Sequence, residues 1–184
     1  MTPEKTAFRP RIYLAGPYVF FPNRDEIFRD LKSRCERAGL TGVAPIDAPI
    51  QHNAADGEDQ LAQAIYDGNV ALLRNADGCI ANLQSFRGLE PDSGTVFEVG
   101  FAVALGKPVV VYGVPPGTYA QRVEAMLACK RDAKGALREA ANGTTVEGLG
   151  QRLNLMLTRS THLAPDAEAA IALMARLVDG GPWM

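Results

Sequence analysis

Two carboxylates, Asp92 and Glu98, are the residues best suited to chemistry in this chain of 184 amino acids. They lie in the run EPDSGTVFEVG at residues 90–100, which follows an apolar run at residues 78–83. The apolar run predicts a buried strand, and the small residues after the carboxylates predict a helix over residues 95–105. Both carboxylates are therefore expected where a strand ends and a helix begins, the edge at which open α/β sheets bind ligands. Paired carboxylates are the usual groups of glycosyl transfer, in which one attacks the anomeric carbon or stabilises an oxocarbenium ion.

Several common motifs are absent from the sequence, and their absence narrows the chemistry. No G-x-G-x-x-G follows the first apolar run, and no G-x-x-x-x-G-K-[ST] is present, so we expect neither a dinucleotide cofactor nor nucleoside triphosphate hydrolysis. A G-x-S-x-G nucleophile elbow is also missing. The two histidines, His52 and His162, leave little for a zinc site or a His-based triad. We therefore predict a carboxylate-based site without metal or cofactor.

Composition is typical of a soluble globular protein. Hydrophobic residues make up 47% and charged residues 22% of the chain, and the formal net charge is -2. This balance argues against a nucleic-acid partner. The three cysteines are scattered without C-x-x-C spacing, and we find no signal peptide and no membrane-spanning run, so a cytoplasmic location is expected. The length predicts one domain over residues 1–184, with residues 1–10 as a flexible N-terminal tail.

Strand and helix signals alternate along the chain, as the positioning of the carboxylates requires. The predicted strands cover residues 11–15, 40–44, 77–83 and 109–112. The predicted helices run from an N-cap at Asn23 to Gly39, over 61–72, over 95–105, as one or two helices over 122–141, and over 166–177. Short βα units of this kind predict a single-domain, doubly wound, mostly parallel sheet flanked by helices, a Rossmann- or flavodoxin-like α/β fold.

Four motifs resemble those of the nucleoside 2-deoxyribosyltransferase family. They occur in the family's order and cover most of the chain: IYLAGP at residues 12–17, ANL with FRG at residues 81–88, EPDSGTVFEVG at residues 90–100, and NLML at residues 154–157. The third motif is highly specific. The resemblance implies exchange of the base of a 2′-deoxynucleoside in nucleotide salvage, with 2′-deoxynucleosides and free nucleobases as the small-molecule partners.

The resemblance also implies roles for individual residues. Glu98 would be the nucleophile that attacks C1′ and forms a covalent 2-deoxyribosyl-enzyme, which a second base or water resolves with net retention. Tyr13 would orient Glu98 by a hydrogen bond, and Asp92 would bind a sugar hydroxyl. Asn154 would reach the 5′-hydroxyl from a neighbouring subunit, which predicts a homo-oligomer. Since Glu98 must be ionised to attack, we expect its pKa to be normal or depressed.

The remaining site residues that the resemblance implies surround the sugar and the base. Asn69 falls near both, Gly16 and Phe20 line the base pocket, and Asp47 is a candidate for base recognition.

Two alternatives stay open. The first is a 2′-deoxynucleoside 5′-monophosphate N-hydrolase, whose relatives tend to carry serine at the position of Asp92. Because an aspartate repels a 5′-phosphate, Asp92 favours unphosphorylated nucleosides. The second alternative is a nucleotide-binding module without turnover, which the fold alone does not exclude. The presence of both Asp92 and Glu98 argues against it, since a binding module has no need of a carboxylate at an electrophilic carbon.

Overall fold

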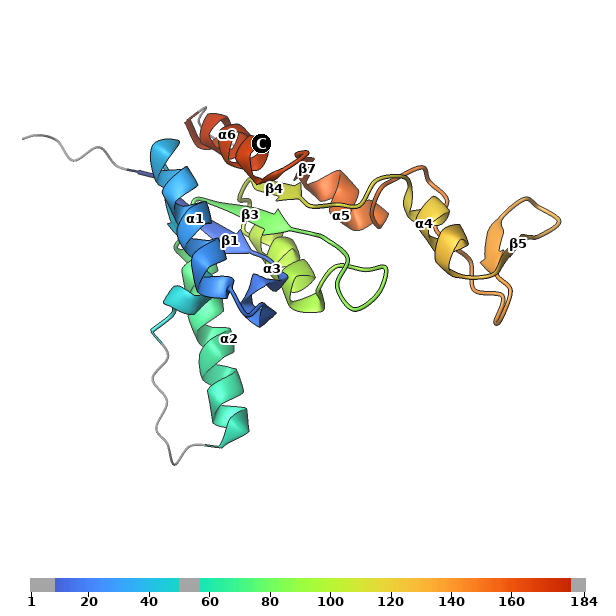
Figure 1. Ribbon diagram of the computed structural model, residues 1–184, viewed down its shortest axis with the longest axis horizontal. Coiled ribbons are helices and arrows are strands. Elements are labelled where there is room, and N and C mark those ends of the chain that lie inside the picture. The colour runs from blue at the N-terminus through green and yellow to red at the C-terminus, as the bar shows by residue number, and fades with distance from the viewer. Residues whose placement is uncertain (1–8, 50–56, 180–184) are drawn as a thin grey trace, which may run out of the picture.

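A parallel five-stranded sheet forms the centre of the structure (Figure 1), a computed structural model that describes residues 9–49 and 57–179. Residues 1–8 of the predicted N-terminal tail lie outside the described residues. Each neighbouring pair in the order β2-β1-β3-β4-β7 is parallel. The five strands are β1 (Arg11–Ala15), β2 (Thr41–Val43), β3 (Gly78–Asn82), β4 (Val109–Tyr112) and β7 (His162–Leu163). This confirms the predicted doubly wound α/β fold and is the strand order of flavodoxin-like proteins.

Helices cover both faces of this sheet. They are α1 (Arg24–Arg37), α2 (Glu58–Arg74), α3 (Ser93–Ala104), α5 (Leu155–Ser160) and α6 (Ala167–Asp179). Helix α4 (Tyr119–Met126) lies away from the sheet, and two short 3-10 helices, η1 (Pro17–Phe20) and η2 (Pro45–Asp47), follow β1 and β2. Alternate residues of a strand point to opposite faces. On β1, Tyr13 packs in the core formed with α2, α3 and α5, whereas Ile12 and Leu14 pack in the core formed with α1 and α6.

The start of α3 differs slightly from the prediction, and the difference moves the candidate nucleophile. Asp92 is the N-cap residue, and its side chain accepts a hydrogen bond from the backbone N–H of Thr95. The helix therefore begins at Ser93, two residues earlier than predicted, and Glu98 lies in its second turn instead of its first.

Between β4 and α5 the chain leaves the sheet and forms an arm over residues 113–153, which extends to the right in Figure 1. The prediction of one or two helices over residues 122–141 is wrong beyond Met126, where α4 ends. An antiparallel hairpin follows instead, made of β5 (Cys129–Arg131) and β6 (Leu137–Glu139).

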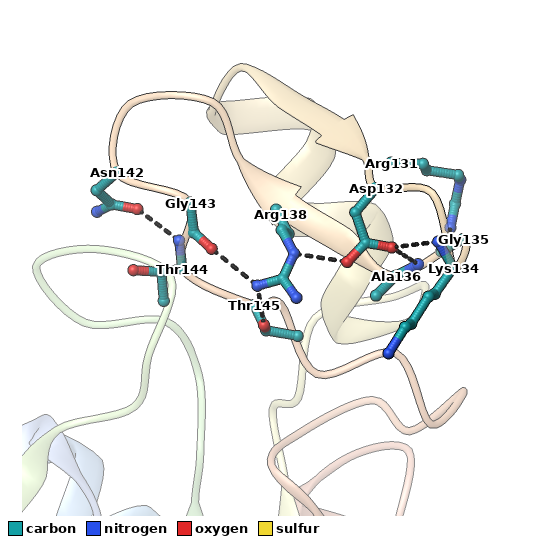
Figure 2. A network of polar contacts seen from close by, with 10 residues as sticks. All are labelled: Arg131, Asp132, Lys134, Gly135, Ala136, Arg138, Asn142, Gly143, Thr144 and Thr145. Carbon is teal, nitrogen blue, oxygen red and sulfur yellow. Dashed lines mark hydrogen bonds and ion pairs between the residues drawn. The ribbon is translucent and has the colours of Figure 1, made fainter.

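The turn of this hairpin explains why a helix does not form there. Figure 2 shows Asp132 accepting hydrogen bonds at Oδ1 from the backbone N–H groups of Lys134 and Ala136, and at Oδ2 from Arg138 Nε at 2.7 Å. Gly135 takes the left-handed φ of 81°. Side-chain to backbone bonds of this type compete with helix formation, and the helical spacing of apolar residues did not reveal them.

The described residues include no helix with both the length and the apolar character needed to cross a membrane.

Candidate active site

Strand β1 and the N-terminal half of α3 bring the predicted catalytic residues together. Tyr13 lies on β1 and is fully buried, and Glu98 lies on α3 above the same face of the sheet. The Tyr13 hydroxyl donates a hydrogen bond to Glu98 Oε1 at 2.5 Å. Such a contact restricts the carboxylate to one orientation and leaves its second oxygen for another partner.

The electrostatic environment of Glu98 differs from our expectation. Burial raises its pKa from 4.5 to about 7, the hydrogen bond from Tyr13 lowers it, and the negative charge of Asp92 raises it. The expectation of a normal or depressed pKa was therefore wrong, because loss of water outweighs the donor that Tyr13 supplies. Burial, together with the charge of Glu98, also raises the pKa of Tyr13, so the phenol keeps its proton and stays a donor.

A cavity of about 390 Å³ opens above Glu98. Its volume suits a small organic molecule. Glycines, apolar side chains and polar groups from five elements and their adjoining loops line it: Gly16, Val19, Phe20, Arg24, Pro45, Ile46, Ile65, Asn69, Asp92, Gly94, Thr95 and Glu98. The cavity thus combines two carboxylates at one part of its wall with aromatic and aliphatic surface at another.

Asp92 serves both the helix and the cavity. Its Oδ2 atom accepts hydrogen bonds from the backbone N–H and the hydroxyl of Thr95, each at 2.9 Å. Among the described residues, Oδ1 has no hydrogen-bond partner, and the residue lines the cavity together with Glu98. An ionised carboxylate is an acceptor only, so this oxygen suits a hydroxyl donor.

Asn69 reaches the cavity from α2 and carries an unpaired acceptor. Its Oδ1 atom is buried and finds no hydrogen-bond partner among the described residues. Buried polar atoms are nearly always paired in native proteins, so an orphan acceptor in a cavity wall suits a donor from a bound molecule.

Gly16 and Phe20, for which the resemblance implied a place in the base pocket, lie in the turn after β1 and both line the cavity. Gly16 has φ 154°, and a Cβ at this position would lie 3.2 Å from Asn82 Cβ and 3.3 Å from the ring of Tyr18. A side chain at position 16 would therefore crowd the turn that presents Phe20. Phe20 is 56% exposed.

Two of the predicted site residues, Asn154 and Asp47, are absent from the described lining of the Glu98 cavity. Asn154 caps α5, where its Oδ1 accepts from the Met156 N–H and its Nδ2 donates to Glu147 Oε2 at 2.9 Å. It lines a separate groove of about 620 Å³ between α3 and α5. Asp47 is absent from the described wall of the Glu98 cavity, because its carboxylate binds Lys32 Nζ at 2.6 Å and the Ala44 N–H at 2.8 Å.

The sequence interpretation missed one charged residue of the cavity. Arg24 is the first residue of α1. It is the one basic residue among the described residues that line the cavity. Its position directly after the turn that follows β1 was the available signal, since that turn lies at the ligand-binding edge of the sheet. No group of three or more potential metal-ligating side chains occurs in the parts of the chain at 9–49 and 57–179.

Comparisons of sequence and of structure both find 2-deoxyribosyltransferases that resemble this chain. A family model described as nucleoside 2-deoxyribosyltransferase matches residues 12–156. The structure is similar to a 2-deoxyribosyltransferase from Leishmania mexicana, with 28% sequence identity, a TM-score of 0.68, and coverage of 91% of this chain and 97% of that chain.

Two further relatives are more distant or less complete. A 2-deoxyribosyltransferase from Bacillus psychrosaccharolyticus shares the fold, with 18% identity, a TM-score of 0.56, and coverage of 95% of this chain and 99% of that chain. An uncharacterised protein of Schizosaccharomyces pombe is 38% identical over 117 residues, which are 62% of this chain. The match spans about half of that relative, 54% of its length.

Proposed function

Because this chain belongs to the nucleoside 2-deoxyribosyltransferase family, we propose that it transfers 2-deoxyribose between the nucleobases of 2′-deoxynucleosides. The observation that carries the proposal is the Glu98 carboxylate, held at 2.5 Å by the Tyr13 hydroxyl and facing a cavity that Asp92 also lines. A role in nucleotide salvage in the cytoplasm is part of the proposal.

Glu98 is the nucleophile of the proposed reaction. Its free carboxylate oxygen bonds to C1′ while the C1′–N bond breaks, and the departing base takes the bonding electron pair and then a proton from water. In the second half, a nitrogen of the incoming base attacks C1′, the bond between C1′ and Glu98 breaks, and the nitrogen gives its own proton to water. Two displacements at one carbon give net retention. A 2-deoxy sugar lacks an electron-withdrawing 2-hydroxyl group, so positive charge at C1′ forms more easily.

Three neighbouring groups support this chemistry. Tyr13 stays protonated and orients the nucleophile. Asp92 accepts a hydrogen bond from a sugar hydroxyl through Oδ1, the oxygen that the helix cap leaves unpaired. Arg24 lines the cavity and pairs through Nε with Asp25 Oδ1 at 3.4 Å, and its remaining guanidinium donors are available to stabilise the negative charge that a departing base acquires. An arginine does so without giving up its proton.

We further propose a homo-oligomer in which Asn154 from a second copy completes the site. In its own chain Asn154 lines the groove between α3 and α5, apart from the Glu98 cavity. Apolar side chains on α2 and α3 also remain open in the single chain: Ile65 is 40% exposed, and Tyr66 and Phe97 are each 49% exposed with their rings 6.1 Å apart. Contiguous exposed apolar surface of this kind is typical of protein interfaces.

A chromatographic exchange assay tests the proposed function. The purified protein is incubated with deoxyinosine and adenine, with thymidine and adenine, and with each nucleoside alone. Deoxyadenosine that forms only when adenine is present establishes transfer. Free base released at the same rate with or without adenine would establish a hydrolase instead, and the 5′-monophosphate is then the next substrate to assay.

Matched variants separate turnover from binding in the same assay. We expect Glu98→Gln to abolish exchange while nucleoside binding persists, because the amide keeps the shape of the side chain and cannot attack C1′. Glu26→Gln, an exposed change on α1, is the control for altered charge. Undiminished exchange by Glu98→Gln would show that another group performs the attack, and binding without any exchange by the unmodified protein would identify a binding module.

A further inference from the structure

Three side chains form a stack beside the mouth of the Glu98 cavity, and we name Phe20, Phe86 and Arg87 the mouth stack. The rings of Phe20 and Phe86 are stacked, with centroids 5.4 Å apart and an interplanar angle of 22°. The Arg87 guanidinium carbon lies 4.8 Å from the Phe86 centroid and 5.5 Å from the Phe20 centroid. Of the three, Phe20 lines the cavity. The mouth stack therefore backs a wall of the cavity from outside.

The backbone at Arg87 takes a conformation that arginine seldom adopts. Its φ is 54°, and it is the one residue other than glycine with positive φ among the residues at 9–49 and 57–179. Non-glycine residues in this region are uncommon and, when they persist, cluster at functional sites where the surroundings enforce them. Glycine would adopt the same φ without strain, so the arginine side chain must contribute something that glycine lacks.

The loop that carries Arg87 connects the two halves of the candidate site. It leaves β3, closes with a hydrogen bond from the Phe86 N–H to the Glu90 carbonyl at 2.9 Å, and continues into Asp92 at the start of α3. Its ring contact with Phe20 joins it to the turn after β1. A shift of this loop would therefore displace both the wall of the cavity at Phe20 and the carboxylate at Asp92.

From this geometry we infer that Arg87 is a positioning residue: it holds Phe20 and Phe86 together so that Phe20 presents a fixed surface for a planar nucleobase. The inference rests on the proposed function for its substrate. A guanidinium over an aromatic face is attracted by the ring quadrupole, and here one guanidinium serves two rings. Without it, Phe20, which is 56% exposed, is free to rotate away from the cavity.

Arg87→Gly is the decisive variant, because it removes the guanidinium and also relieves the backbone strain. We expect KM for the donor nucleoside to rise roughly two- to thirtyfold, the change that loss of a cation–π contact corresponds to. We expect kcat to stay within about twofold, since Glu98 and Tyr13 are untouched. Arg87→Lys keeps a cation and should recover part of the loss, and Arg29→Ala, at an exposed position on α1, is the control.

Measurements of melting temperature and of adenine binding show whether the inferred role of Arg87 or the proposed function has failed. Arg87→Gly should melt at or above the temperature of the unmodified protein, so a large fall in melting temperature with equal loss of kcat and affinity would indicate a structural role and overturn the inference. An unchanged KM would overturn it too. Calorimetric titration with free adenine tests the mouth stack without turnover. If the unmodified protein binds adenine and exchanges nothing, the proposed function fails, while a weaker affinity in Arg87→Gly would still support the positioning role.

Discussion

The hydroxyl of Tyr13 and Oε1 of Glu98 lie 2.5 Å apart, although 85 residues separate them in the sequence. The contact joins β1, an inner strand of the sheet, to the second turn of α3, so it depends on the packing of that helix on the sheet. It also opposes the effect of burial on Glu98, because the phenol favours the ionised carboxylate whereas loss of water disfavours it.

Tyr13→Phe removes the donor and leaves the ring. We expect kcat to fall roughly 10- to 100-fold, the range for loss of a hydrogen bond to a charged group. Because the Tyr13 hydrogen bond lowers the pKa of Glu98, its loss should also move the acidic limb of the pH profile of kcat/KM to higher pH. The measurement is a pH–rate series for both proteins. A lower rate with an unmoved acidic limb would show that Tyr13 acts on something other than Glu98.

Because the pKa of Glu98 is raised in the folded protein, we expect the free energy of unfolding to depend on pH. The folded protein holds Glu98 with a pKa of about 7, against 4.5 for a glutamate side chain that is free in water. The folded state therefore binds the proton more tightly, and this contribution is present below pH 4.5 and lost as pH rises through about 7. The difference corresponds to at most roughly 3 kcal/mol of unfolding free energy.

Glu98→Gln removes the ionisable group and should therefore stabilise the protein above pH 8 and much less at pH 5. Denaturant unfolding at both values of pH measures the difference. Equal changes in the free energy of unfolding at the two values would show that Glu98 titrates normally in the folded chain.

Different substitutions of Asp92 separate its helix-capping role from its role in the cavity. Asparagine and serine are good N-caps, whereas alanine is not. Asp92→Ala should lower the free energy of unfolding by about 1 kcal/mol, while Asp92→Asn and Asp92→Ser should nearly preserve it. All three should raise KM for deoxynucleosides, because each lacks the negative acceptor for a sugar hydroxyl.

Asp92→Ser further tests the choice between nucleoside and nucleotide. Removing the carboxylate removes its repulsion of a 5′-phosphate, so the ratio of kcat/KM for a deoxynucleoside 5′-monophosphate to that for the nucleoside should rise. Side-by-side assays of both substrates give this ratio. If the ratio does not change, position 92 does not determine phosphate selectivity.

The sequence predicted the sheet well because its strands follow from local signals, and the contact between Tyr13 and Glu98 agrees with the hydrogen bond that the family resemblance implied. Short apolar runs that end at turns locate β1, β3 and β4, and the edge of a parallel sheet is a known ligand site. The two-residue strand β7 carries too short an apolar pattern to be detected. The hairpin at residues 129–139 was missed because the side chain of Asp132 determines its turn.

Features that depend on packing between distant segments could not be predicted in the same way. The pKa of Glu98 depends on how much water the folded cavity excludes. The unusual φ of Arg87 is likewise visible only in three dimensions.

The proposed contribution of Asn154 from a second copy can be tested by mixing two inactive variants. In Glu98→Gln the nucleophile is missing, and in Asn154→Ala the group that completes the neighbouring site is missing. If the sites are shared, a mixed dimer contains one site with both residues intact. Random reassortment of equal amounts should then restore about a quarter of the unmodified activity, since half of the dimers are mixed and each has one of its two sites complete.

The control for this mixing experiment is Phe97→Glu combined with each variant. The charge lies on the exposed apolar face of α3 and should prevent association, so the mixture should recover nothing and sediment as single chains. Recovery in the first mixture and none in the second supports a site shared between copies. If Asn154→Ala alone retains full activity, or if the mixture recovers nothing although the chains associate, each cavity works without Asn154 from a second copy.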